Sequence, residues 1–197
     1  FSHHSSIAPT GTISLSLANN ASNGIEPSFA HHYSRNVIRE GKKSKEKVDV
    51  FEPGRVANSV KLMKVKHAVI TSVDRDDLSD GGSEIWVSTV KAIRRQSPST
   101  TLETLIPDFA GNWKNLQNII NVAPEIVSHN IETVRRLTKT IRVQAKYNRS
   151  LELLLRLKQG EMKTKSGLML GLGETHEEVL ETLEDLRSVN VDIVTLG

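Results

Sequence analysis

Short apolar runs alternate with longer amphipathic segments through residues 53–197. Runs of this length that are rich in β-branched residues and leucine predict buried strands, at residues 67–73, 102–106, 125–128, 165–170 and 191–196. Apolar residues at three- and four-residue spacing predict helices, at residues 55–65, 83–95, 112–122 and 150–158. Thr175 and Glu178 have the spacing of a capping box and predict one more helix start, and Asn112 is a suitable helix cap.

This regular alternation indicates an α/β fold with a parallel sheet. We expect five parallel strands, centred near residues 70, 104, 127, 168 and 194, with helices on one side of the sheet. Polar segments follow the first four strands, at residues 74–82, 108–111, 129–133 and 171–174. Such loops all converge on one face of a barrel, but only those at the switch point meet in an open sheet. Their even distribution therefore favours a barrel or partial barrel.

Composition narrows the class of protein. Of the 197 residues, 37% are hydrophobic and 25% are charged, which is ordinary for a soluble globular protein. The net charge is only +3 with acids and bases intermingled, so no nucleic-acid partner is expected. No apolar run approaches the roughly 20 residues that span a bilayer, so no membrane partner is expected either. Residues 1–50 are rich in Ser, Asn, His and Ala without a helical period, which predicts an irregular N-terminal tail.

The chain contains no cysteine. This excludes disulfides, thiol catalysis and iron–sulfur clusters held by its own thiolates. The histidine pairs His3–His4 and His31–His32 could bind a metal, but no third ligand has suitable spacing, so no metal site is predicted. Because the first residue is Phe1 rather than Met, we expect a fragment or a processed product.

Two glycine-rich segments approach phosphate-binding patterns without matching them. GLGE lacks the third glycine of a dinucleotide fingerprint, because His176 stands in its place. GEMKTKS has Thr164 where a phosphate loop requires glycine. Gly171 and Gly173 would still let main chain approach a ligand beside the free N–H groups of a helix start. The alternative is a tight turn between a strand and a helix.

The segment DRDDLSDGG, residues 74–82, puts four aspartates after a strand. The calcium-loop pattern fails, because Leu78 occupies a ligand position and no glutamate follows at the right distance. The paired glycines before the next helix could bind a ligand's carboxylate, or its amine through their carbonyl groups. The alternative is a solvated acidic loop.

The segment SHNIET places His129, Asn130 and Glu132 at the end of a strand. Asn130 and Glu132 together offer a hydrogen-bond donor and acceptor that could clasp a ribose diol. The alternative is that Asn130 caps a helix.

Residues 53–197 resemble lipoyl synthase, a family of radical S-adenosylmethionine enzymes. The segments that carry the resemblance are VKLMKVKHAVITSVDRDDLSDGGSE, LIPDFAGN, SHNIETVRRL, TKSGLMLGLGETHEEVLETLEDLR and VDIVTLG. The resemblance implies a partial (β/α)6 TIM-like barrel, here without its first strand. It implies insertion of two sulfur atoms into a protein-bound octanoyl chain in lipoate biosynthesis. It also implies S-adenosylmethionine and two 4Fe–4S clusters as cofactors, octanoylated lipoyl-carrier domains as partners, and a cytoplasmic location.

The same resemblance assigns roles to residues of the strand ends. It would place Asp80, Gly81 and Gly82 by the methionine amino group, Asn130 and Glu132 at the ribose, and Gly171, Gly173 and Glu174 near the adenine. The family's CxxxCxxC motif and the cysteines of its auxiliary cluster have no counterpart in this chain. No catalytic residue is therefore assigned, and we expect the chain to be inactive as a sulfurtransferase.

Residues 1–50 resemble a segment of adenosylcobalamin-dependent ribonucleotide reductase, on the stretch IAPTGTISLSLANNASNGIEPSFAHHYSRNV. This resemblance implies phosphate binding by main-chain N–H groups at a helix start, with Pro9, Thr10, Gly11 and Thr12. We interpret the chain as a fusion of this tail with the partial barrel of residues 53–197, and expect the tail to pack poorly on the barrel. The alternatives are a ribonucleotide reductase fragment and a non-catalytic fold that binds S-adenosylmethionine.

Overall fold

A computed structural model describes residues 47–142 and 145–197 of this protein. Its helices are α2 (Glu52–Met63), α3 (Ser83–Gln96), α4 (Trp113–Val122), α5 (Arg135–Ile141), α6 (Tyr147–Gln159) and α7 (His176–Ser188), with a 3-10 turn η1 (Phe109–Gly111). Its strands are β1 (His67–Thr71), β2 (Thr101–Leu105), β3 (Ile126–Ser128), β4 (Thr164–Leu168) and β5 (Ile193–Leu196). The histidine pairs and the predicted phosphate contacts of Pro9, Thr10, Gly11 and Thr12 lie outside the described residues.

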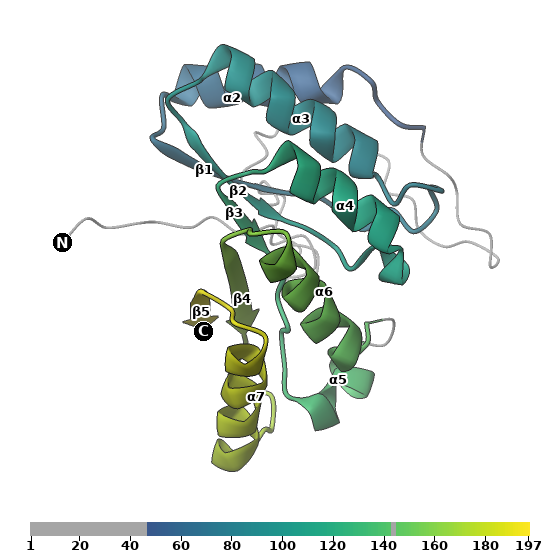
Figure 1. The fold of residues 1–197 in the computed structure, drawn as a ribbon, viewed down its shortest axis with the longest axis vertical. Coiled ribbons are helices and arrows are strands. Elements are labelled where there is room, and N and C mark those ends of the chain that lie inside the picture. The colour runs from purple at the N-terminus through teal and green to yellow at the C-terminus, as the bar shows by residue number, and fades with distance from the viewer. Residues whose placement is uncertain (1–46, 143–144) are drawn as a thin grey trace, which may run out of the picture. The chain divides into compact units, whose positions relative to one another are not determined.

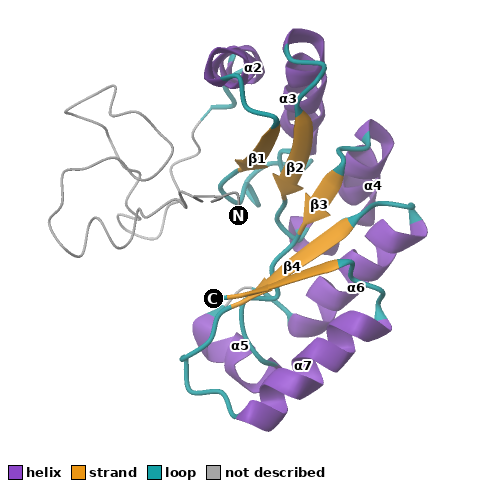
Figure 2. Ribbon diagram, turned by 90° about the vertical axis from the view of Figure 1, so that its left-hand side faces the viewer, coloured by secondary structure: helices purple, strands orange, loops and turns teal. Residues whose placement is uncertain are grey.

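The five strands form one parallel sheet whose spatial order, β1-β2-β3-β4-β5, is the order of the chain (Figure 1). This confirms the predicted strands and their direction. The helices cover one side of the sheet, as expected, and leave the other side free of helices in the described part of the chain (Figure 2). The strand order never reverses, as it would in a doubly wound sheet, so the arrangement is that of a partial barrel.

The core lies between the sheet and its helices. One buried cluster joins α2, α3 and the strands β1 and β2, a second joins α4 and α6 to β3, and a third joins α6 and α7 to β4. Leu153, Leu154 and Leu157 of α6 are completely buried, so this helix contributes to two of the three clusters. Among the described residues, none of the helices is long and apolar enough to cross a membrane.

A charged network crosses the helix-free side of the sheet. Leu102 faces the helices, so its neighbour Glu103 points to the opposite side of the strand. The Glu103 carboxylate accepts a 2.6 Å hydrogen bond from Ser128 Oγ and lies 3.0 Å from Lys165 Nζ. His67 Nε2 lies 3.6 Å from the same carboxylate. Residues from four strands thus meet around one buried acid.

Both predicted helix caps are present, whereas two helical segments were not predicted. Thr175 and Glu178 form the predicted capping box, and Asn112 accepts a 3.2 Å hydrogen bond from the Lys114 N–H as the predicted cap. The short helix α5 and the turn η1 were not predicted. The residue before α5 is Val134, which makes no side-chain cap bond, so the sequence carries no start signal there.

His129 is a completely buried polar link between the sheet and α6. Its Nδ1 lies 3.0 Å from the Ile106 carbonyl oxygen and its Nε2 lies 2.9 Å from Ser150 Oγ. Both ring nitrogens are therefore engaged when the ring is neutral, with Nδ1 donating to the carbonyl and Nε2 accepting from the hydroxyl. Burial lowers the pKa of His129 to about 4.

The first prediction concerns α6. Leu157→Ala should lower the free energy of unfolding by about 2–5 kcal/mol, because Leu157 is fully buried and its removal leaves a cavity. The matched control on the same helix is Leu155→Ala, whose side chain is 36% exposed and should cost much less. Urea unfolding of both variants measures the difference. Equal losses at the two positions would contradict the described packing of α6.

The second prediction concerns His129. Its pKa in the folded protein is about 4, below the ordinary value of 6.5, so the unfolded chain takes up a proton first as pH falls. The contribution of His129 to stability should be constant above pH ~6.5 and decline towards pH ~4, by about 3 kcal/mol in all. Urea unfolding across this range should show that decline in the wild type and a flatter profile in His129→Gln.

The matched control is His176→Gln on the exposed surface of α7. This variant should keep the wild-type pH profile. A wild-type profile in His129→Gln would show that another group causes the acid sensitivity.

Candidate functional site

The predicted site residues lie at the carboxyl ends of the strands. Asp80, Gly81 and Gly82 belong to the connection between β1 and α3, Asn130 and Glu132 follow β3, and residues 171–174 join β4 to α7. Because adjacent parallel strands all point the same way, these three segments lie along one edge of the sheet. The sequence therefore predicted the common edge correctly.

Asn130 and Glu132 are brought together directly. The Asn130 side-chain amide donates to Glu132 Oε1 at 3.1 Å. Main-chain bonds hold Glu132 against β4, because its N–H donates to the Gly167 carbonyl at 2.9 Å and its carbonyl accepts from the Met169 N–H at 2.8 Å. Glu132 has a φ of 65°, which is uncommon for a residue with a side chain and is a form of strain found at functional sites. Asn130 does not cap a helix.

The turn before α3 is built around Asp80. Its carboxylate accepts hydrogen bonds from the N–H groups of Gly82 at 3.2 Å and Glu84 at 3.0 Å. Gly81 has a φ of 57°, and a Cβ at this position would lie 2.9 Å from Phe109 Cδ1. Glycine is required at Gly81 for both reasons. The Asp80 carboxylate is thus engaged by the start of the helix.

In the connection between β4 and α7, the Glu174 side chain binds the main chain of the same turn. The Glu174 carboxylate accepts the N–H groups of Gly171 at 2.5 Å and Leu172 at 2.8 Å. These bonds, the one from Gly171 foremost, hold the pKa of Glu174 below its ordinary value. The sequence suggested that free N–H groups at the start of the following helix would face a ligand, but the Glu178 N–H there donates to Thr175 Oγ1. Gly173 has a φ of 101° and no heavy atom within 4 Å of the place of a Cβ.

Arg136 of α5 forms hydrogen bonds to the connection between β4 and α7 and to the helix that follows it. Its guanidinium donates to both carboxylate oxygens of Glu178, at 2.6 and 2.9 Å, and to the Gly173 carbonyl at 2.8 Å. Glu178 also accepts the Thr175 N–H, and the pKa of Glu178 is lowered to about 2, first by Arg136 and then by that N–H. The segment after β3 and the segment after β4 are therefore tied together twice, through Glu132 and through Arg136.

The acidic segment after β1 contains an aspartate with a raised pKa. The pKa of Asp74 is raised to about 6, chiefly by partial burial and then by the nearby carboxylates of Asp76 and Asp108. Asp108 itself pairs with Arg149 at 3.0 Å. Asp74 is only partly buried, so this group agrees with the solvated acidic loop that the sequence left open.

The described residues do not fit an iron–sulfur cluster. They contain no group of three His, Cys, Asp or Glu side chains that could hold a metal ion. The whole chain has no cysteine, so it has no thiolate to offer to iron. The Asn130–Glu132 pair instead places a side-chain amide and a carboxylate side by side at a strand end.

Two features of this region escaped the sequence analysis. One is the Glu103 network, for which the only signal was a charged residue within an otherwise uncharged strand, between Leu102 and Thr104. The other is Arg136, which lies in a basic run that reads as ordinary helix surface. His129 was grouped with Asn130 and Glu132, but the structure buries it on the side of α6.

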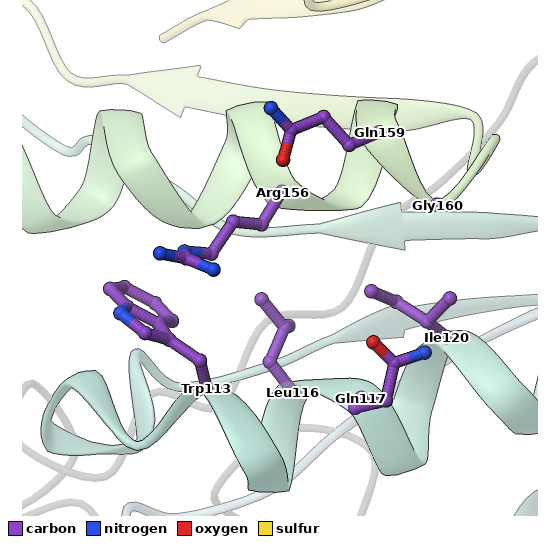
Figure 3. Close-up of a pocket in the computed structure, with 7 residues that line it drawn as sticks. All are labelled: Trp113, Leu116, Gln117, Ile120, Arg156, Gln159 and Gly160. Carbon is purple, nitrogen blue, oxygen red and sulfur yellow. The ribbon is translucent and has the colours of Figure 1, made fainter.

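A cavity of about 280 Å³ lies away from the strand ends, between α4 and α6 (Figure 3). Its lining residues are Trp113, Leu116, Gln117, Ile120, Arg156, Gln159 and Gly160. Arg156 stacks over the Trp113 ring at 4.6 Å and pairs with Glu152. Because these helices lie on the covered side of the sheet, this cavity is separate from the site at the strand ends.

The chain matches the radical SAM superfamily over residues 29–186. It is 69% identical over 153 residues to the mitochondrial lipoyl synthase of Nematostella vectensis, covering 77% of this chain and 53% of that protein. It is 65% identical over 153 residues to the lipoyl synthase of Flavobacterium johnsoniae, with 77% and 53% covered. It is 55% identical over 152 residues to that of Bacillus subtilis, with 76% and 51% covered. The chain thus spans about half the length of these relatives.

Solved structures of lower identity share the fold. The [FeFe]-hydrogenase maturase HydG matches with a TM-score of 0.64 at 13% identity, over 80% of this chain and 38% of that one. Methylornithine synthase matches with a TM-score of 0.59 at 12% identity, over 79% of this chain and 45% of that one. Both likenesses agree with a partial TIM-like barrel.

Proposed function

This chain belongs to the radical SAM superfamily, and we propose that it forms the S-adenosylmethionine-binding part of a lipoyl synthase. The observation that supports the proposal most strongly is the 69% identity to a lipoyl synthase over 153 residues. The superfamily implies S-adenosylmethionine and 4Fe–4S clusters as cofactors, and this chain's residues suit the first of them only.

In this proposal the ribose end of the cofactor meets the segment after β3. The Asn130 amide and the Glu132 carboxylate already lie 3.1 Å apart, so one donor and one acceptor face a vicinal diol together. The bonds from Glu132 to β4 hold the pair in place before the ligand arrives, which lowers the entropy lost on binding.

The other two segments would contact the adenine and the amino group. Gly171 and Gly173 leave main chain uncovered at the end of β4, where a flat base can approach closely. Glu174 shapes this turn by binding its N–H groups. The Asp80 carboxylate binds two N–H groups of its own turn, and the Gly82 carbonyl accepts the Trp86 N–H. We therefore assign the contact with the ligand's amino group to the main-chain carbonyl of Gly81.

The activity of a whole lipoyl synthase would be insertion of two sulfur atoms into an octanoyl chain on a lipoyl-carrier domain. This chemistry needs iron–sulfur clusters, and this chain supplies no thiolate for either the first or the second. We therefore propose that the chain by itself binds the cofactor without catalysing the reaction. The number of clusters, the carrier-domain partner and the cytoplasmic location stay predictions, as does the reductase-like origin of residues 1–50.

The third prediction concerns activity. The chain, reconstituted anaerobically with iron and sulfide, should yield neither 5′-deoxyadenosine nor a lipoyl product from S-adenosylmethionine and octanoylated carrier domain with dithionite. The reason is the missing thiolate ligands. Mass spectrometry of the reaction, against a control without protein, measures both products. Either product above that control would overturn the proposal that the chain is inactive.

The fourth prediction concerns the ribose contact. Calorimetry should detect binding of S-adenosylmethionine, and Asn130→Ala and Glu132→Ala should each weaken it about tenfold, the effect of one lost hydrogen bond in a partly buried site. The matched controls are Asn121→Ala on α4 and Glu181→Ala on α7, both exposed and away from the strand ends. Unchanged affinity in the first two variants would remove the ribose assignment, and no binding by the wild type would remove the cofactor site.

A further inference from the structure

Gly167 of β4 lies directly beneath the Asn130 side chain. It is buried, and a Cβ built on it would lie 2.9 Å from Asn130 Oδ1 and 3.1 Å from Asn130 Cγ. Real Cβ atoms do not approach other heavy atoms as closely as the first of these distances, so no larger residue fits while the amide stays where it is. A glycine inside a strand often marks such a close approach.

The backbone of Gly167 offers no other reason for glycine. Its φ is not among the positive values, which occur at Gly81, Gly82, Gly111, Gly171 and Gly173 among the described glycines. Gly171 and Gly173 have the opposite character, since they have positive φ and no heavy atom within 4 Å of the place of a Cβ. Replacement of Gly167 by alanine is therefore a steric change that leaves the backbone conformation allowed.

The same glycine also holds the partner of Asn130. The Gly167 carbonyl accepts the Glu132 N–H at 2.9 Å, and the Asn130 amide donates to Glu132 Oε1 at 3.1 Å. Gly167 thus binds the Glu132 N–H through its carbonyl group. Because Gly167 has no side chain, it also leaves room for the Asn130 amide. Thr195 of β5 closes the far side of this space, with its Oγ1 3.2 Å from the place of the Cβ.

We propose that Gly167 is a positioning residue, which seats the Asn130 amide and thereby aims the Asn130–Glu132 pair at a ligand with a vicinal diol. The part of this statement that concerns the ligand rests on the proposed function. Asparagine has a short side chain that can turn away from an added methyl group. The main effect of Gly167→Ala should therefore be a displaced amide rather than a lost fold.

The first experiment observes the Asn130 side-chain amide directly. Nitrogen-15 NMR of the side-chain amide groups of the chain identifies the Asn130 signals by their loss in Asn130→Ala. In Gly167→Ala these signals should move, because the hydrogen bond to Glu132 is broken or bent. The matched control is Gly54→Ala in α2, where no heavy atom lies within 4 Å of the added Cβ, and there the Asn130 signals should stay in place. Unmoved signals in Gly167→Ala overturn the proposal.

The second experiment separates positioning from general packing. Gly167→Ala should weaken S-adenosylmethionine binding about tenfold in the wild-type background, as loss of the Asn130 contact does. In the Asn130→Ala background it should cause little further loss, because the group it displaces is gone. An equal loss in both backgrounds would mean that Gly167 acts through another neighbour, such as Thr195, and would overturn the proposal.

The two experiments also separate this inference from the proposed function. If the wild-type chain binds no S-adenosylmethionine, the cofactor assignment fails, while the NMR comparison still decides whether Gly167 seats Asn130. If binding is found and the Asn130 signals do not move, the cofactor assignment stands and the role of Gly167 falls.

Discussion

Parallel pairing of five consecutive strands is the constraint on which the rest of this structure depends. Parallel strands need a crossover between each pair, and here every crossover contains helix that packs on the same side of the sheet. The helices bury their apolar faces on this side of the sheet. Polar loops connect the carboxyl ends of β1 to β4 to the helical segments that follow them. Asp80, Asn130, Glu132 and Glu174 lie along one edge for this reason, although they are far apart in the sequence.

The helix-free side of the sheet has a different chemistry because it carries a buried charge. Glu103 is only 4% exposed, and a carboxylate in such a position is costly unless it is paired and hydrogen-bonded. Lys165 supplies the charge and Ser128 the hydrogen bond, and they come from the two strands beyond β2. The network therefore links β2, β3 and β4 from the side opposite the helices. It sits close in sequence to the site, since Lys165 is two residues before Gly167 and Ser128 two before Asn130.

The repeating parts of the fold could be predicted from the sequence, and the parts that depend on single contacts could not. Strands and long helices show their period directly, and the capping box at Thr175 is a local signal. The helix α5 has seven residues and starts after Val134 without a cap, so no local signal marks it. The identities of Asn130 and Glu132 suggested a clasp, but the φ of Glu132 and the space above Gly167 arise only when β3 and β4 pair.

The acids of the site illustrate why residue type alone did not fix their roles. Asp80 and Glu174 looked like ligand contacts, yet each carboxylate binds two N–H groups of its own turn. Glu132 differs, because its carboxylate accepts only a side-chain amide in the described contacts and its main chain is held by β4. A carboxylate that binds the N–H groups of a turn is hard to redirect to a ligand without unfolding that turn. A carboxylate paired with a side-chain amide can accept a hydrogen bond from a diol while the amide donates one to it. On this physical ground we propose that the ribose contact belongs to the segment after β3, and that the turns after β1 and β4 would contribute main chain.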